Sequence, residues 1–238
     1  MPGLRCAVFG ASGGIGAALV DALALREDVA VVHAGARRQG AGGGKVRPFA
    51  FDLTDEASIA AACTGIGAPL DLAIVATGRL TLSDGSGPEK SYRALDAARL
   101  AESFAVNAIG PALVAKHVLP LLPKDRRSVF AALSARVGSI SDNRLGGWHG
   151  YRASKAALNM LVRNFAVELG RTHRDAVVVA LHPGTVDTGL SAPFQKGVAE
   201  GKLFTAEFAA DRLLAVLDGL GPADSGKLFA WDGAEVAF

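Results

Sequence analysis

Two polar side chains four residues apart, Tyr151 and Lys155, could together carry out proton transfer. On a helix, residues at this spacing share a face, so the Lys155 ammonium can lie near the Tyr151 phenol. A nearby cation favours the phenolate and would bring the phenol pKa, ordinarily about 10, toward neutrality. Tyr151 is then a candidate general acid for reducing a carbonyl and general base for oxidising an alcohol. Taken alone, the two residues could also be an ordinary helical pair with a solvated ammonium.

A glycine-rich segment near the start of the chain could hold a phosphate. Residues 10–16 read GASGGIG and follow a short apolar run, which predicts a strand, a tight turn and the start of a helix. Glycine is needed where backbone must approach a pyrophosphate, and the free N–H groups at a helix start favour an anion. A tight turn without a ligand is the alternative for such a cluster. The candidate cofactor-binding residues here are Gly10, Ser12, Gly13, Gly14, Ile15 and Gly16.

The same segment fits the pattern G-x-S-x-G, which would make Ser12 the nucleophile of a hydrolase. Such a serine normally follows a later strand and needs an acid and a histidine further along the chain. His182 could serve as that histidine, but no local feature pairs it with an acid. The hypothesis also leaves Tyr151 and Lys155 without a role, so the nucleotide-binding hypothesis is the stronger of the two.

The elements that must position these residues alternate along the chain. Strands are expected at Arg5–Phe9, Val29–His33, Val46–Phe51, Leu70–Val75, Ser128–Leu133, Val177–His182 and Leu228–Trp231. Helices are expected at Ile15–Arg26, Glu56–Cys63, Leu95–Leu119, Arg152–Gly170 and Ala206–Leu217. This alternation predicts a doubly wound α/β fold of Rossmann type, with a parallel sheet and helices on both faces. No stretch resembles a linker, so we expect one domain spanning residues 1–238.

Charge and composition narrow the classes of partner. The 25 basic residues nearly balance the 23 acidic ones, so the net charge of +2 argues against a nucleic-acid or membrane partner and favours a small molecule. Neither a secretion signal nor an uninterrupted apolar run of membrane-spanning length is expected. Cys6 and Cys63 have no disulfide or zinc spacing, and His149 has no second histidine at ligand spacing. We therefore expect a cytoplasmic protein without a metal site.

The motifs occur in an order that resembles the short-chain dehydrogenase/reductase family over almost the entire chain. They are the glycine turn, Asp52-Leu-Thr, Asn107, Ser134, Tyr151-x-x-x-Lys155 and the segment His182–Thr188. The segments Ser134–Asn143 and Tyr151–Asn159 look like the C-factor branch, which includes cell-signalling proteins and carbonyl reductases. The resemblance implies an enzyme that moves a hydride between nicotinamide and a small carbonyl or alcohol substrate.

The resemblance also implies residue roles. Tyr151 would donate or take the proton, and Lys155 would hold the nicotinamide ribose and lower the tyrosine pKa. Ser134 would hydrogen-bond the substrate oxygen, and Asn107 would anchor a water that connects Lys155 to solvent. The alternatives are a helix-backbone contact for Asn107 and a simple strand-end hydroxyl for Ser134. The other implied cofactor contacts are Asp52 at the adenine, Thr188 at the carboxamide, and Leu53, Ala76, Thr77, Gly78, Pro183, Gly184 and Val186.

Two departures from the family pattern matter. Family members often carry two serines where this chain has Ser134-Ala135, and aligning on Gly138 would place the active serine at Ala135. Ser134 is our choice, with Ser139 as the second candidate. The familiar Asn-Asn-Ala-Gly after the fourth strand is replaced by Val75–Gly78, which keeps the glycine but loses an asparagine that usually braces the sheet.

Two arginines bear on the choice of cofactor. In NAD-preferring folds an acid after the second strand binds the ribose 2′-hydroxyl, but here the chain continues into Arg37 and Arg38. A guanidinium can bind a 2′-phosphate through two hydrogen bonds, which predicts NADP(H), with NAD(H) as the alternative cofactor. If the arginines are merely solvated loop residues, this preference disappears.

The last expectations concern the pocket and the assembly. Residues 189–205 mix apolar and flexible positions and could form a lid over the substrate. Family resemblance implies a homodimer or homotetramer. A non-catalytic dinucleotide-binding signalling protein of C-factor type is the main functional alternative.

Overall fold

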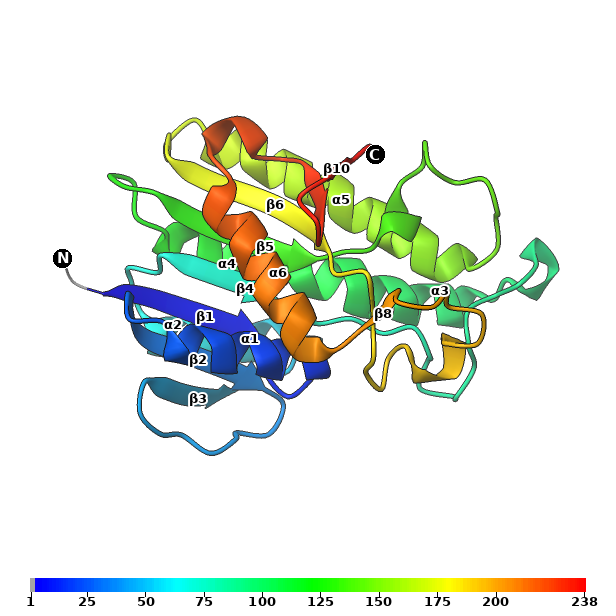
Figure 1. The fold of residues 1–238 in the computed structure, drawn as a ribbon, viewed down its shortest axis with the longest axis horizontal. Coiled ribbons are helices and arrows are strands. Elements are labelled where there is room, and N and C mark those ends of the chain that lie inside the picture. Colours follow the sequence, from blue (N-terminus) through cyan, green and yellow to red (C-terminus); the bar gives the residue numbers. More distant parts are fainter. Residues whose placement is uncertain (1–2) are drawn as a thin grey trace.

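The short apolar runs of the chain become the strands of one sheet (Figure 1). The computed structural model describes residues 3–238, and the main sheet has the order β10-β9-β6-β5-β4-β1-β2-β3. All neighbouring strands in it are parallel except β9 and β10. The strands are β1 Leu4–Phe9, β2 Val29–Ala36, β3 Val46–Ala50, β4 Leu72–Val75, β5 Ser128–Leu133, β6 Ala176–His182, β9 Leu228–Ala230 and β10 Glu235–Val236. A separate parallel pair is formed by β7 Thr185–Val186 and β8 Leu203–Phe204.

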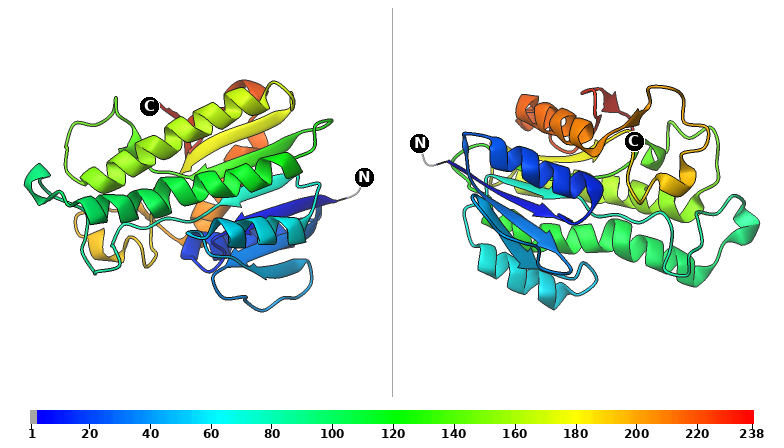
Figure 2. Two further views of the ribbon diagram at one scale, coloured as in Figure 1. Left: turned by 180° about the vertical axis from the view of Figure 1, so that it is seen from behind. Right: turned by 60° about the horizontal axis from the view of Figure 1, so that its bottom comes forward.

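Helices cover both faces of the sheet. They are α1 Gly14–Leu25, α2 Glu56–Ile66, α3 Ala97–Phe104, α4 Gly110–Val118, α5 His149–Leu169 and α6 Ala206–Gly219. Helices α1 and α6 lie on the face seen in Figure 1, and α2, α4 and α5 lie on the opposite face, as Figure 2 shows. The buried apolar side chains accordingly form two clusters, one on each face. The predicted doubly wound α/β fold is confirmed.

Local sequence signals start several of these helices. The side chains of Asp55, Asp96 and Thr205 accept hydrogen bonds from backbone N–H groups at the starts of α2, α3 and α6. Such N-cap contacts satisfy donors that have no partner inside the helix. Helix α5 has no side-chain cap of its own, since its N-cap residue is Trp148.

Strand β2 continues three residues beyond the predicted end at His33, so the predicted loop 34–44 begins only at Arg37. The additional residues pair with β3, and Gly35 lies opposite Phe49. A Cβ at Gly35 would lie only 2.3 Å from the tip of the Phe49 ring. Glycine therefore gives the Phe49 ring the space to cross this strand, a long-range packing effect that the local pattern does not reveal.

The single helix predicted at Leu95–Leu119 is divided. A π-helical turn, Ala105–Ile109, separates α3 from α4, and Pro111 follows it in the first turn of α4. Proline lacks an N–H group, so it cannot continue the regular ladder of hydrogen bonds across this point. A π-helical turn inside a longer helix is often found at a functional site, and this one carries Asn107.

The composite helix Ala97–Leu121 is long and apolar enough, by length and composition alone, to cross a membrane. The sequence-based expectation considered only uninterrupted apolar runs and did not detect this segment. It is weak evidence for a membrane span, because core helices pass the same test. Here α3 packs against α5, and α4 packs against α2, on one face of the sheet (Figure 2).

The turn between β1 and α1 depends on close backbone approach. Gly10 has φ +101°, a conformation that favours glycine, and a Cβ there would meet Ala76 and Thr77 at 3.0 Å. A Cβ at Gly16 would lie only 2.1 Å from the Gly10 carbonyl oxygen, which is rigid backbone. The first turn of α1 therefore lies directly against the end of β1.

We predict that Gly16→Ala destabilises the protein. Helix propensity alone would favour alanine by about 1 kcal/mol, but overpacking against a backbone oxygen costs about 3 kcal/mol. The net loss of about 2 kcal/mol should lower the melting temperature by about 4–8 °C in a calorimetric scan. Gly13→Ala is the matched control, because its Cβ would lie 3.5 Å from the same oxygen. A melting temperature for Gly16→Ala equal to that of Gly13→Ala would contradict the steric argument.

Candidate active site

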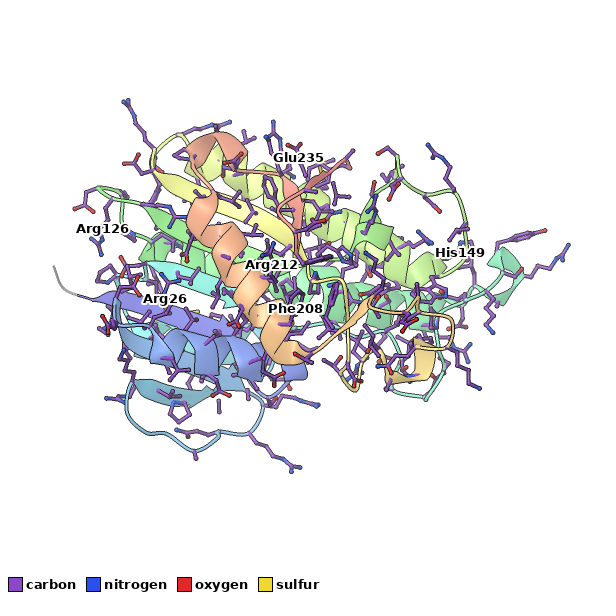
Figure 3. All side chains as sticks on the ribbon, in the orientation of Figure 1. Arg26, Arg126, His149, Phe208, Arg212 and Glu235 are labelled. Carbon is purple, nitrogen blue, oxygen red and sulfur yellow. The ribbon has the colours of Figure 1, made fainter. Side chains whose placement is uncertain are left out.

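A cavity of about 520 Å³ opens at the carboxyl ends of β1, β4, β5 and β6. This is the edge at which ligands of open α/β sheets bind. Figure 3 shows His149, at the start of α5, at the end of the molecule opposite Arg26 and Arg126. The predicted site residues that line the cavity are Ser12, Gly13, Gly14, Ile15, Ala76, Thr77, Gly78, Ser134, Tyr151, Lys155, Pro183, Gly184, Val186 and Thr188.

The first turn of α1 faces this cavity. Gly13 is the N-cap residue and offers no side chain to the free N–H groups of the following turn. Gly14 lies against the loop that follows β6, where a Cβ would meet the Thr188 methyl group at 2.6 Å. The glycine turn and the Thr188 loop, far apart in the sequence, therefore form adjoining walls. Gly10 and Gly16 shape this turn from behind and do not line the cavity.

The residues predicted at the adenosine end form a second group outside the cavity lining. Arg37 and Arg38 are exposed directly after β2, and Asp52 is exposed after β3. Hydrogen bonds from the Thr54 N–H and hydroxyl lower the Asp52 pKa, and the nearby Arg37 charge adds to this effect. Leu53 packs instead against Gly110, where a Cβ would lie 2.5 Å from the Leu53 Cγ. Positive charge and a carboxylate thus gather at the ends of neighbouring strands.

Tyr151 and Lys155 face the same cavity from the first turns of α5, as their spacing predicts. The Lys155 Nζ lies 6.0 Å from the centroid of the Tyr151 ring and donates a 2.8 Å hydrogen bond to the Leu133 carbonyl. Burial raises the pKa of Tyr151 to about 12 and lowers that of Lys155 to about 7. Desolvation is the larger effect on both groups, and a lowering of the tyrosine pKa by Lys155 stays a prediction.

Asn107 is fully buried in the π-helical turn and holds the loop that follows β4. Its Oδ1 accepts a 2.8 Å hydrogen bond from the Arg79 N–H, and its Nδ2 donates to the Arg79 carbonyl at 2.9 Å. The side chain thus satisfies loop backbone rather than the helix backbone of the sequence-based alternative. The neighbouring Gly78 lies beside both side chains, since a Cβ there would be in ordinary contact with Asn107 Oδ1 at 3.5 Å and with Lys155 Nζ at 3.6 Å. Asn107 supplies a brace in a region where the chain lacks the family's usual asparagine.

The two candidate serines lie in different surroundings. Ser134 lines the cavity, and its hydroxyl donates a 2.6 Å hydrogen bond to the Asn159 Oδ1. Ser139 does not line the cavity, and its Oγ accepts a hydrogen bond from the Asp142 N–H. Ala135, the position suggested by alignment on Gly138, does line it. The geometry favours Ser134 over Ser139, although the Ser134 hydroxyl would have to rotate before it could donate to a substrate.

The proposed lid segment contributes apolar side chains to the cavity. Leu190, Phe194 and Val198 all line it. The Phe194 ring meets the Trp148 ring edge-on, with centroids 5.6 Å apart. Phe194 also approaches Gly87 on the loop after β4, where a Cβ would lie 3.4 Å from its ring. The segment therefore reaches the opposite wall of the cavity in this structure.

Sequence reasoning missed several lining residues, including Leu80, Leu133 and Val137. They lie next to motif residues along the chain or in loops, and no local pattern distinguishes them. His182 also lines the cavity, and burial together with the nearby Arg136 charge lowers its pKa to about 4. Its Nδ1 has no hydrogen-bond partner in the described part of the chain. The structure thus does not support a hydrolase in which His182 activates Ser12.

Comparisons with known proteins agree with this geometry. One relative is the C-signal of Myxococcus xanthus, which is 37% identical over 142 residues (60% of this chain, 80% of the relative). Another is the 1-hydroxy-2-glutathionyl-2-methyl-3-butene dehydrogenase of Rhodococcus sp. (strain AD45), which is 34% identical over 186 residues (76% of each chain). The structure is similar to that of the NADPH-bound carbonyl reductase from chicken fatty liver (TM-score 0.84, 25% identity, 100% and 96% of the two chains covered). It also resembles the carbonyl reductase Sniffer of D. melanogaster (TM-score 0.85, 20% identity, 99% and 100% covered).

The expected resemblance to the C-factor and carbonyl reductase branch is thereby confirmed. The family model described as short chain dehydrogenase matches residues 5–199, which is more than half of the chain. The chain belongs to the short-chain dehydrogenase family.

Proposed function

We propose that the protein is an NADP(H)-dependent oxidoreductase that transfers a hydride between nicotinamide and an uncharged carbonyl or alcohol. The observation that carries this proposal is the placement of Tyr151 and Lys155 on one cavity with the glycine turn at its edge. Family membership establishes an oxidoreductase, and the substrate and the tyrosine mechanism are the proposed parts.

The residues of the site fit a dinucleotide. Short-chain dehydrogenases use NAD(P)(H), which when bound supplies or accepts the hydride. The free N–H groups at the start of α1 would hold the pyrophosphate, and Lys155, which lines the cavity beside Gly78, would hold the nicotinamide ribose. The arginines at the end of β2 would hold the 2′-phosphate, which favours NADP(H) over NAD(H). The NADPH-bound carbonyl reductase with a similar fold supports the same preference.

In carbonyl reduction, Tyr151 would donate its phenolic proton to the developing alkoxide, and in alcohol oxidation it would accept the proton. Burial keeps the phenol protonated at neutral pH, but its raised pKa also makes it a weaker acid, so proton transfer requires stabilisation of the phenolate. A charged Lys155 would stabilise the phenolate left after proton transfer. None of the described aspartates, glutamates and arginines lines the cavity, so an uncharged, mainly apolar substrate fits best.

One observation supports the signalling alternative, namely the 37% sequence identity to the C-signal of Myxococcus xanthus over 142 residues. A pure sensor would need the nucleotide site but not a tyrosine and a buried lysine on the same cavity, so the catalytic proposal is favoured. Two free, buried cysteines support the proposed cytoplasmic location. The proposed self-association into a dimer or tetramer rests on the family resemblance.

We predict that Tyr151→Phe lowers turnover of aldehydes, ketones or quinones with NADPH by about 10²-fold or more, because the proton donor is lost. The dissociation constant for NADPH should stay within a few-fold of the wild-type value. The control is Tyr92→Phe, which changes the other tyrosine of the chain, an exposed side chain outside the cavity. Equal turnover of Tyr151→Phe and wild type would remove Tyr151 from the mechanism.

A second prediction concerns the buried lysine. Between pH 7 and its ordinary pKa of 10.5, Lys155 is largely neutral in the folded protein and protonated in the unfolded chain. The folded state therefore binds fewer protons, and wild-type stability should rise with pH across this window. Lys155→Met removes this effect. The unfolding free energy of Lys155→Met minus that of the wild type should therefore fall by about 2–3 kcal/mol from about pH 7 to about pH 9.5. A difference that does not change with pH would show that Lys155 remains protonated.

A third prediction concerns the cofactor. Replacing Arg37 and Arg38 with alanine should weaken NADPH binding by about ten- to a hundredfold, or 1.5–3 kcal/mol, and leave NADH binding nearly unchanged. The salt dependence of NADPH binding should also decrease. Arg171→Ala/Arg174→Ala, two exposed arginines after α5, is the charge-matched control. If the wild type binds NADH as tightly as NADPH, the NADP(H) assignment fails.

A further inference from the structure

Glu89 is a buried acidic residue that the proposed chemistry leaves without a role. It lies in the loop between β4 and α3, and only 8% of its surface is exposed. Its Oε2 accepts a 3.0 Å hydrogen bond from the Gly150 N–H. Its backbone carbonyl accepts a second bond, of 2.5 Å, from the Trp148 N–H. One residue of the β4–α3 loop thus holds two N–H groups at the start of α5.

These contacts replace the cap that α5 lacks. Trp148, the N-cap residue, has φ +50° and ψ +42°, a left-handed conformation that a bulky side chain seldom adopts. Trp148 donates no side-chain cap to the helix. A negative charge near a helix N-terminus is favourable, since the N–H dipoles point toward it. Glu89 therefore stabilises both the strained residue and the first turn of α5 from a distant part of the chain.

Glycine at the helix start gives the carboxylate space to approach. A Cβ at Gly150 would lie 3.0 Å from the Glu89 Oε1 and 3.3 Å from the Leu100 side chain. Gly147 also lies close to the Glu89 carbonyl oxygen, since a Cβ at Gly147 would be 3.6 Å from it. The backbone of residues 147–150 thus packs closely on the loop that carries Glu89.

The contact of Glu89 with residues 148–150 also positions two residues that line the cavity, Trp148 and Tyr151. Tyr151 directly follows Gly150, and its ring meets the Trp148 ring edge-on with centroids 6.3 Å apart. The Trp148 ring in turn meets Phe194 of the lid segment. A displacement of residues 148–150 would therefore move both the phenol and the aromatic surface against which a substrate would pack.

We propose that Glu89 is a positioning residue that places Tyr151 for proton transfer and Trp148 for substrate packing by holding the start of α5. This inference rests on the proposed function, because it assigns catalytic consequences to the contact. We call the two hydrogen bonds from Trp148 and Gly150 to Glu89 the clamp. Its loss should lower kcat by displacing Tyr151 and raise the KM for the carbonyl substrate by displacing Trp148. The dissociation constant for NADPH should change little, because the glycine turn and the arginines lie elsewhere.

The test compares Glu89→Ala, Glu89→Asp and Glu89→Gln in the full-length protein. Glu89→Ala should lower kcat at least tenfold and raise the KM for an aromatic ketone several-fold, with NADPH binding within twofold of wild type. Glu89→Asp keeps the charge but shortens the reach by one methylene, so it should lose activity in part. Glu89→Gln keeps an acceptor of the same length and should restore kcat to within about threefold. Glu168→Ala, an exposed acid near the other end of α5, is the control.

A fluorescence measurement provides a readout that does not depend on activity. The chain has two tryptophans, so Trp231→Phe leaves Trp148 as the single reporter. In that background Glu89→Ala and Glu89→Asp should increase acrylamide quenching of Trp148, and Glu89→Gln should not.

The outcomes separate this inference from the proposed function. Wild-type kcat, KM and Trp148 quenching in Glu89→Ala would overturn the clamp, even if the melting temperature fell. If Glu89→Ala does not fold, the same result in Glu89→Asp would overturn it. If the wild type turns over no carbonyl with NADPH, the proposed function and the catalytic part of this inference fail together, while the quenching series still tests whether Glu89 holds Trp148.

Discussion

The close approach of Gly16 to the Gly10 carbonyl is the constraint on which the rest of the site depends. No side chain other than hydrogen fits between these two backbone segments, so α1 starts directly at the end of β1. That position brings Gly14 against Thr188 and leaves the free N–H groups of the helix at the cavity edge. The loops after β4 and β6 are then close enough to complete the cavity wall. A larger residue at Gly16 would move the helix start and with it the proposed pyrophosphate site.

Buried polar contacts hold the remaining walls in place. Asn107 holds the backbone of Arg79, Asn159 accepts a hydrogen bond from Ser134, and Lys155 donates to the Leu133 carbonyl. Each contact joins a helix on one face of the sheet to a strand end or a loop. Because unpaired polar groups in a protein interior are costly, each of these residues also restricts how its neighbours can move. The family's usual asparagine is absent after β4, and Asn107 and Glu89 hold the two ends of the loop that follows.

Burial determines the protonation states in the site. Lys155 is buried and Tyr151 is half-buried beside the cavity, and desolvation favours the neutral form of each. The phenol therefore keeps its proton at neutral pH, and the pKa of the Lys155 amine lies well below its ordinary value. The phenol thus holds the proton that carbonyl reduction would need, and a positive charge on Lys155 would stabilise the phenolate that remains.

The amino-acid sequence by itself determined the fold class and the order of the motifs. The alternation of apolar strand runs with helical segments is local, so the doubly wound sheet could be predicted, and the glycine turn and the Tyr151–Lys155 spacing are equally local. Element boundaries were less accurate, because β2 extends through Gly35 only where Phe49 of another strand crosses it. The assigned roles of the arginines remain predictions.

Only the tertiary structure decided how the motif residues are held and which state they adopt. The π-helical turn at Asn107, the hydrogen bond between Ser134 and Asn159 and the contact of Glu89 with α5 join residues 25 to 61 positions apart. No periodicity in the sequence reports such contacts. The raised tyrosine pKa was missed for the same reason, because desolvation depends on everything packed around a group, whereas the spacing of Tyr151 and Lys155 reports only their shared helix face.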